Sequence, residues 1–71
     1  MKVVSHKTEG LIEKFVVDIE GYKYYFTEFL DKNCLSIGSE LLDGHGREVV
    51  DKAVIGVIQK LIDRYLADEF S

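Results

Sequence analysis

Three residues of this 71-residue chain have side chains and spacing that could bind a metal ion or transfer protons. His6 and Glu13 flank the Glu9-Gly10 pair, and Glu28 follows a second pair at Glu20-Gly21. If each pair forms a tight two-residue loop, the imidazole and both carboxylates align across adjacent antiparallel strands. Such a set could hold a divalent metal or form a cluster with shifted pKa values. The alternative is an ordinary polar row, with Glu13 opposite Glu28 as a like-charge pair.

The remaining reactive side chains do not form a recognisable catalytic or metal-binding motif. Cys34 is the sole cysteine, so no disulfide can form within the chain, and two histidines do not complete a zinc site. No local motif pairs Cys34 with a histidine as nucleophile and base. His45 lies in Gly-His-Gly, which lacks the lysine and the glycine spacing of a phosphate loop. We therefore expect no enzymatic activity and no cofactor.

The elements that would position these residues can be inferred from the glycines and the apolar alternation. A tight Glu20-Gly21 loop defines a hairpin whose first face is nearly all apolar. On that face, Ile19, Val17, Phe15 and Leu11 oppose Tyr22, Tyr24, Phe26 and Leu30. On the second face, Asp18, Val16, Lys14 and Ile12 oppose Lys23, Tyr25, Thr27 and Phe29. The opposite charges of Asp18 and Lys23 favour this register.

A further strand follows a turn at residues 31–34. Placing Leu35 opposite Leu30 puts Leu35, Ile37 and Leu41 on the apolar face and requires a loop of two or four residues. Gly38 within this strand is a candidate bulge. An N-terminal edge strand completes the predicted sheet, whose strands we place at about 2–7, 11–19, 22–30 and 34–42.

A helix is predicted from about residue 47 to about 67. Its main apolar stripe contains Val50, Val54, Val57, Ile58, Leu61 and Tyr65. Ile55, Ile62 and Leu66 widen the stripe to an arc of roughly 180°, beyond the ~100° that a surface helix needs. Either the curved sheet buries the whole arc, or these three residues contact a second chain.

Together these elements predict a single α+β domain over residues 1–71. A three- to four-stranded antiparallel meander precedes one long C-terminal amphipathic helix, which packs on one sheet face. A chain of this length buries a modest core and often gains stability from a partner. We therefore expect a homodimer.

Composition and charge narrow the classes of function. The apolar fraction of 46% is that of a globular domain, and no run is long enough for a signal peptide or a membrane span. We expect a cytoplasmic protein. The net charge of −4 is evenly spread, without the basic stripe that a grip on phosphates needs. Binding to nucleic acid is therefore not expected.

The surplus of apolar surface gives the leading hypothesis for function. One helix can cover one sheet face, which leaves Val16, Tyr25 and Phe29 exposed on the other. With Ile55, Ile62 and Leu66 on the helix, these residues are the predicted partner-binding surface. The sequence thus favours a small non-enzymatic protein-interaction module, an inhibitor or regulatory accessory protein that occludes or bridges a partner. One alternative is a metal- or ligand-binding protein using His6, Glu13 and Glu28, and another is a nucleic-acid-related regulator.

Overall fold

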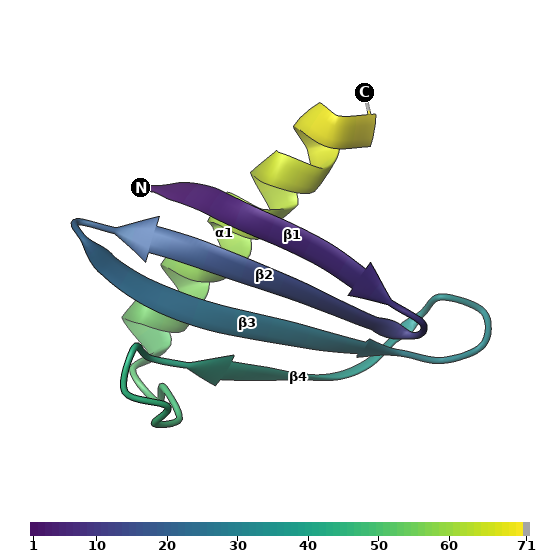
Figure 1. Ribbon diagram of the computed structural model, residues 1–71, viewed down its shortest axis with the longest axis horizontal. Coiled ribbons are helices and arrows are strands. Elements are labelled where there is room, and N and C mark those ends of the chain that lie inside the picture. Colours follow the sequence, from purple (N-terminus) through teal and green to yellow (C-terminus); the bar gives the residue numbers. More distant parts are fainter. Residues whose placement is uncertain (71) are drawn as a thin grey trace.

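The computed structural model describes residues 1–70, which form one antiparallel sheet and one helix (Figure 1). The strands are β1 (Lys2–Glu9), β2 (Ile12–Ile19), β3 (Tyr22–Leu30) and β4 (Ser36–Leu42), and the helix is α1 (Lys52–Phe70). Consecutive strands are neighbours, in the order β1-β2-β3-β4. The predicted α+β meander with a C-terminal helix is confirmed.

The β2–β3 hairpin has the predicted register. Phe15 pairs with Phe26 and Val16 with Tyr25, and the ladder continues regularly to Ile19 opposite Tyr22. Glu20 and Gly21 both have positive φ, at 52° and 86°. Positive φ at both loop positions is the geometry of a type I′ turn, whose twist matches that of the flanking strands.

The β1–β2 hairpin departs from the expected register. Its loop is Gly10-Leu11 instead of Glu9-Gly10, because Glu9 pairs with Ile12. Gly10 supplies the positive φ, 61°, at the first loop position, as in a type II′ turn. The β1 residues from Ser5 onward therefore pair two positions further along β2, and His6 lies opposite Phe15 instead of Glu13.

The β3–β4 connection corrects a second prediction. The Asp31 N–H donates to the Leu35 carbonyl at 2.9 Å, so three residues, not two or four, lie between these paired positions. Leu35 and Ile37 are consequently 63% and 68% exposed instead of lying on the apolar face. A bulge between Ser36 and Gly38 then restores the phase, one residue before the expected position. Leu41 thereby reaches the covered face as predicted and is buried.

A second turn that begins with an aspartate follows β4, and the helix begins only after it. Asp43 Oδ1 accepts hydrogen bonds from the backbone N–H groups of His45 and Arg47, and Gly46 has φ of 78°. The chain then runs back beside β4, where the Val49 N–H donates to the Leu41 carbonyl at 2.9 Å.

This extended return explains why the helix does not begin near residue 47 as predicted. Residues 47–50 are outside it, so Val50 is 78% exposed and does not belong to the helical stripe. Asp51 instead caps the helix, because its Oδ1 accepts from the Ala53 N–H at 2.9 Å. Val50 had the period of a helix, but the N–H of the preceding Val49 is hydrogen-bonded to β4.

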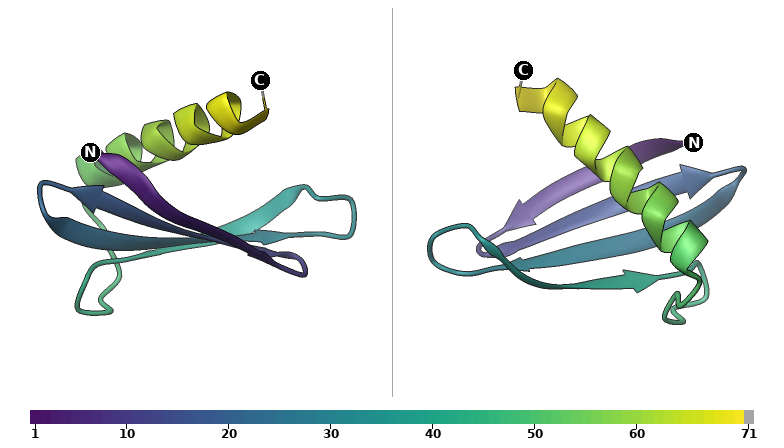
Figure 2. Two further views of the ribbon diagram at one scale, coloured as in Figure 1. Left: turned by 45° about the horizontal axis from the view of Figure 1, so that its top comes forward. Right: turned by 180° about the vertical axis from the view of Figure 1, so that it is seen from behind.

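The helix crosses one face of the sheet diagonally and leaves the other uncovered (Figure 2). The buried core between the helix and the sheet consists of Phe15, Val17, Phe26, Leu41, Ile58 and Ile62. Burying each such side chain contributes about 1.5–3 kcal/mol relative to leaving it exposed. All four sheet residues of this core share one face, which we call the covered face; the opposite side is the open face.

Candidate functional site

The open face carries partly exposed apolar side chains along its middle. The ladder places Val16 beside Tyr25, and Tyr25 beside Leu42, in one row across three strands. Tyr25 is 44% exposed, and Phe29, on the same face, is 37% exposed. Val16, Tyr25 and Phe29 thus lie on the side that the helix does not cover, where the alternation placed them, with the Lys14–Thr27 pair between Tyr25 and Phe29.

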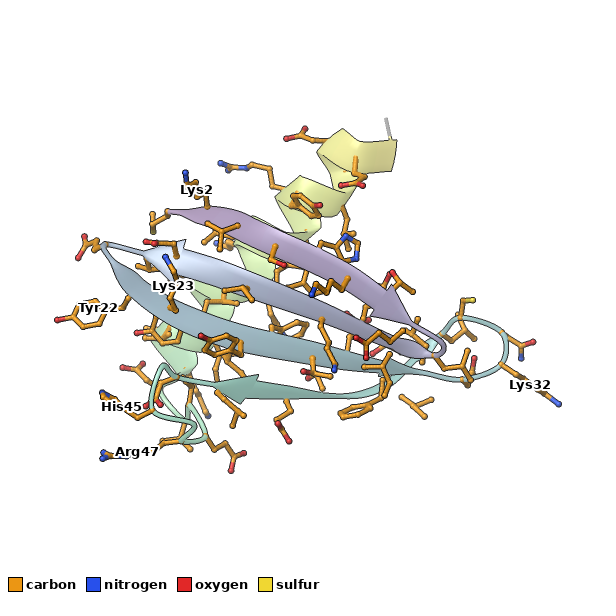
Figure 3. All side chains as sticks on the ribbon, in the orientation of Figure 1. Lys2, Tyr22, Lys23, Lys32, His45 and Arg47 are labelled. Carbon is orange, nitrogen blue, oxygen red and sulfur yellow. The ribbon has the colours of Figure 1, made fainter. Side chains whose placement is uncertain are left out.

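Lysines flank this apolar row on both sides. The four lysines of the sheet, Lys2, Lys7, Lys14 and Lys23, all lie on the open face, as their pairings with one another and with Asp18 require. Lys7 and Lys14 form one flanking row, and Lys2 and Lys23 form the other with Asp18 between them. Figure 3 looks onto this face and labels Lys2 and Lys23 near its β2–β3 end.

Two of these lysines form ion pairs within the face. Lys14 Nζ lies 3.1 Å from Glu9 Oε2, and Lys23 Nζ contacts Asp18. The hydrogen bond from Lys23, with a second from the Gly21 N–H, lowers the pKa of Asp18 below its usual value. With Glu40 as the third carboxylate, the open face holds four lysines against three acids, in a chain whose net charge is −4.

The centre of the open face is slightly hollowed. A shallow cavity of about 260 Å³ lies above β1, β2 and β3. Its lining combines Val16 and Tyr25 with the polar residues Ser5, Lys7 and Thr27 and with the Lys14–Glu9 ion pair. Apolar contact and lysine ammonium groups are therefore available at the same place.

The helix residues Ile55, Ile62 and Leu66, which we expected to contact a partner, contribute little to the exposed apolar surface. Ile62 is only 3% exposed and belongs to the core of this chain. Ile55 and Leu66 are half-buried and pack against that core. The sheet thus covers most of the wide apolar arc of the helix, as in the first of the two interpretations given above. The candidate partner-binding surface is therefore reduced to Val16, Tyr25 and Phe29.

His6 is held between aromatic rings near the β1 edge. Its ring stacks on Phe15, with centroids 4.4 Å apart and planes 10° from parallel, and meets Tyr65 edge-on at 5.5 Å. Its Nε2 lies 3.5 Å from Glu13 Oε1, too far and too poorly aligned for a good hydrogen bond. A hydrogen bond with Glu69 raises the pKa of the neighbouring Tyr65. His6 therefore serves as a packed aromatic residue at this position.

The three residues considered for metal binding are brought together only in pairs. Glu13 lies opposite Glu28 as predicted, but the shifted register moves His6 beside Phe15. Among residues 1–70, no three His, Cys, Asp or Glu side chains form a group that could hold a metal ion. Glu28 also lines a separate hollow of about 280 Å³ between α1 and the sheet. The arrangement favours the polar-row interpretation.

The other reactive side chains lie in the two similar turns. Cys34 is exposed, with φ of 64°, in the turn that follows Asp31. His45 is exposed in the turn that follows Asp43. The backbone N–H groups of Arg47 and His45 lower the pKa of the Asp43 carboxyl, which stays charged and holds the loop. Neither turn brings a nucleophile next to a base.

Three exposed apolar residues at one end of the sheet were not predicted from the sequence. Leu11 in the β1–β2 turn is 47% exposed and adjoins β3, since the Leu30 N–H donates to its carbonyl. Leu35 and Ile37, which we expected on the covered face, lie exposed at the same end of the sheet. The available signal was the uncharged run over residues 33–39, which we interpreted as the end of a turn and the start of a strand with one apolar face.

Comparisons with protein families, with curated proteins and with solved structures find no match for this chain. The helix α1 is not long and apolar enough to cross a membrane. The open face is therefore the feature of this molecule from which a function can be inferred.

Proposed function

We propose that this protein is a small, non-enzymatic interaction module that binds a partner protein on its open face. The observation that carries the proposal is the row of Val16 and Tyr25, with Phe29 beyond the Lys14–Thr27 pair, on the sheet face that α1 leaves uncovered. Exposed aromatic side chains surrounded by polar ones are typical of protein interfaces.

The size of the face fits such a role. The molecule measures 33 × 26 × 19 Å, and its sheet extends along the two longer axes. A stable interface of standard size takes about 800 Å² from each partner. One face of this sheet can supply area of that order, so the partner could be occluded or bridged by a chain this small.

The lysine rows define the chemistry of the partner. Lys7 and Lys14 on one side and Lys2 and Lys23 on the other flank the apolar row. Complementary potentials across an interface increase association rates and select among partners. The partner therefore presents apolar side chains flanked by carboxylates.

Peptide display tests this proposal with a defined probe. Random peptides are selected on the immobilised protein, and the enriched sequences are synthesised and measured by calorimetry. We expect an enriched pattern of aromatic or aliphatic residues flanked by Asp or Glu. The Tyr25→Lys, Phe29→Lys double variant should weaken binding at least tenfold, which corresponds to about 1.4 kcal/mol.

A matched control separates the open face from other exposed aromatics. Tyr22 lies on the same strand, is 71% exposed and has the covered-face register, so Tyr22→Lys should leave peptide affinity unchanged. Enrichment without an acidic pattern, or equal losses in both variants, would refute the proposal. Binding of single-stranded DNA that disappears steeply with salt would instead favour a nucleic-acid regulator.

A further inference from the structure

The two lysine rows of the open face differ in how carboxylates are placed within them. In the row of Lys2 and Lys23, Asp18 lies between the two lysines and contacts Lys23. In the other row, Lys7 pairs directly with Lys14 across β1 and β2, with no carboxylate between them. Like charges directly opposite each other on one sheet face are destabilising. The Lys7–Lys14 pair therefore has positive charge that a bound anion would compensate.

The carboxylate that does contact this pair, Glu9, is weakly held. Its Oε2 lies 3.1 Å from Lys14 Nζ, but the two side chains are 60% and 50% exposed. Exposed ion pairs of this kind contribute little to stability. Lys7 makes no ion pair with any other of residues 1–70. An incoming anion can therefore contact Lys7 directly and compete with Glu9 for Lys14.

The hollow of about 260 Å³ on the open face adjoins this lysine pair and adds hydrogen-bond donors to it. Besides Lys7, Lys14 and Glu9, its lining includes three hydroxyl-bearing residues, which are Ser5, Tyr25 and Thr27. Ammonium groups and hydroxyls both donate hydrogen bonds to a carboxylate, and those from charged donors are the stronger. The same hollow is lined by Val16, so an apolar side chain can pack beside the anion.

We infer that this hollow is the subsite for one carboxylate side chain of the partner, which contacts Lys7 and Lys14 while an adjacent apolar side chain packs on Val16 and Tyr25. The inference rests on the proposed function and adds which lysine row binds the acidic residue. The two rows of the subsite are two residues apart along each strand, about 7 Å, a distance that two side chains of one short segment span.

The charge of the subsite selects a carboxylate over a phosphate group. The lining holds two lysines and one glutamate, which sum to +1. A single carboxylate neutralises that charge, whereas a phosphorylated side chain carries nearly two negative charges at neutral pH. The partner residue at this subsite is therefore Asp or Glu.

The test is a double-mutant cycle between the protein and the acidic peptide selected on the open face. Peptide variants with each Asp or Glu changed to Asn or Gln are measured by calorimetry. One such change should weaken binding to the wild type about tenfold, but to Lys7→Met only about threefold or less, because its partner is absent. Lys2→Met is the matched control: it removes the same charge from the other row and should retain the tenfold loss.

The competition by Glu9 gives a second test with the opposite sign. Glu9→Gln releases Lys14 and should tighten binding of the acidic peptide about threefold. Glu40→Gln removes the same charge from the same face, but Glu40 does not line the hollow, so its effect should be clearly smaller. The peptide whose acidic residue has been neutralised should bind all of these glutamate variants and the wild type equally.

Several outcomes would overturn the inference. Equal coupling of the peptide carboxylate to Lys7 and Lys2, or no gain in Glu9→Gln, would do so while leaving the proposed function intact, provided that binding still depends on Tyr25 and Phe29. A phosphoserine peptide that binds more tightly than its glutamate counterpart would overturn the choice of a carboxylate. An open face that enriches no acidic peptide would overturn both proposals.

Discussion

The two faces of this sheet are built from alternate residues of the same strands, yet they differ in what covers them. On the covered face, Phe15 and Val17 are 1% and 0% exposed beneath α1. On the open face, Val16 lies between them in sequence but beside Tyr25, which is 44% exposed. Apolar alternation alone therefore does not distinguish a core from a binding surface; the number of helices available to cover the sheet does.

The largest effect expected from this comparison is on stability. Phe15→Ala, on the covered face, should lower the free energy of unfolding by about 3–5 kcal/mol, because it leaves a cavity beneath the helix. Tyr25→Ala, its neighbour on the open face, should cost less than about 1 kcal/mol. Urea unfolding followed by circular dichroism measures both. Similar losses would show that the open face is also structurally packed.

An intermediate effect is expected at the turns that bracket β4 and keep its residues in phase with the two faces. Both turns place their fourth residue at positive φ: Cys34 at 64° and Gly46 at 78°. Gly46→Ala should cost about 1–2 kcal/mol, and Cys34→Gly should stabilise by about 1 kcal/mol.

The control for these substitutions is Gly44→Ala. Gly44 does not have positive φ, and an added Cβ would meet the Lys23 carbonyl oxygen at an ordinary 3.5 Å. Thermal unfolding of the three variants should therefore rank Cys34→Gly highest and Gly46→Ala lowest. A loss at Gly44 as large as that at Gly46 would contradict the account of the turn.

The smallest effect concerns the Asp18–Lys23 ion pair on the open face. The folded-state pKa of Asp18 is lowered from 3.8, so its contribution to stability is present above that value and is lost as pH falls through the folded pKa. In thermal melts, the wild type should have a higher Tm than the Asp18→Asn variant at neutral pH. The two Tm values should converge in strong acid. Because the pair is exposed, added salt should reduce the difference. A gap that persists in strong acid would contradict this assignment.

The sequence was sufficient to predict strand pairing where the turn residues and the apolar alternation indicated the same register. The β2–β3 register followed from one Gly-containing loop with complementary side chains on both sides, and it placed Val16, Tyr25 and Phe29 correctly on the open face. Prediction from the sequence failed where a turn and a bulge each shifted the register and compensated for one another. The β3–β4 turn and the bulge at Ile37 offset each other, so Leu41 was correct while Leu35 and Ile37 were not.

The helix and the metal hypothesis failed for related reasons. Val50 had helical spacing, but the hydrogen bond from the preceding Val49 N–H to Leu41 of β4 holds the chain extended there. The alignment of His6 with Glu13 required the Glu9-Gly10 loop, and the actual loop lies one residue later. In both cases, backbone pairing that the side-chain pattern did not encode decided the outcome.

The most direct test of the central claim is an NMR titration of the labelled protein with the selected acidic peptide. The account predicts that the shifted signals concentrate on Val16, Tyr25, Phe29 and the flanking lysines, while Phe15 and Ile58 on the opposite side stay unchanged. Shifts concentrated instead along α1, at Val57 or Gln59, would contradict the assignment of the open face as the binding surface.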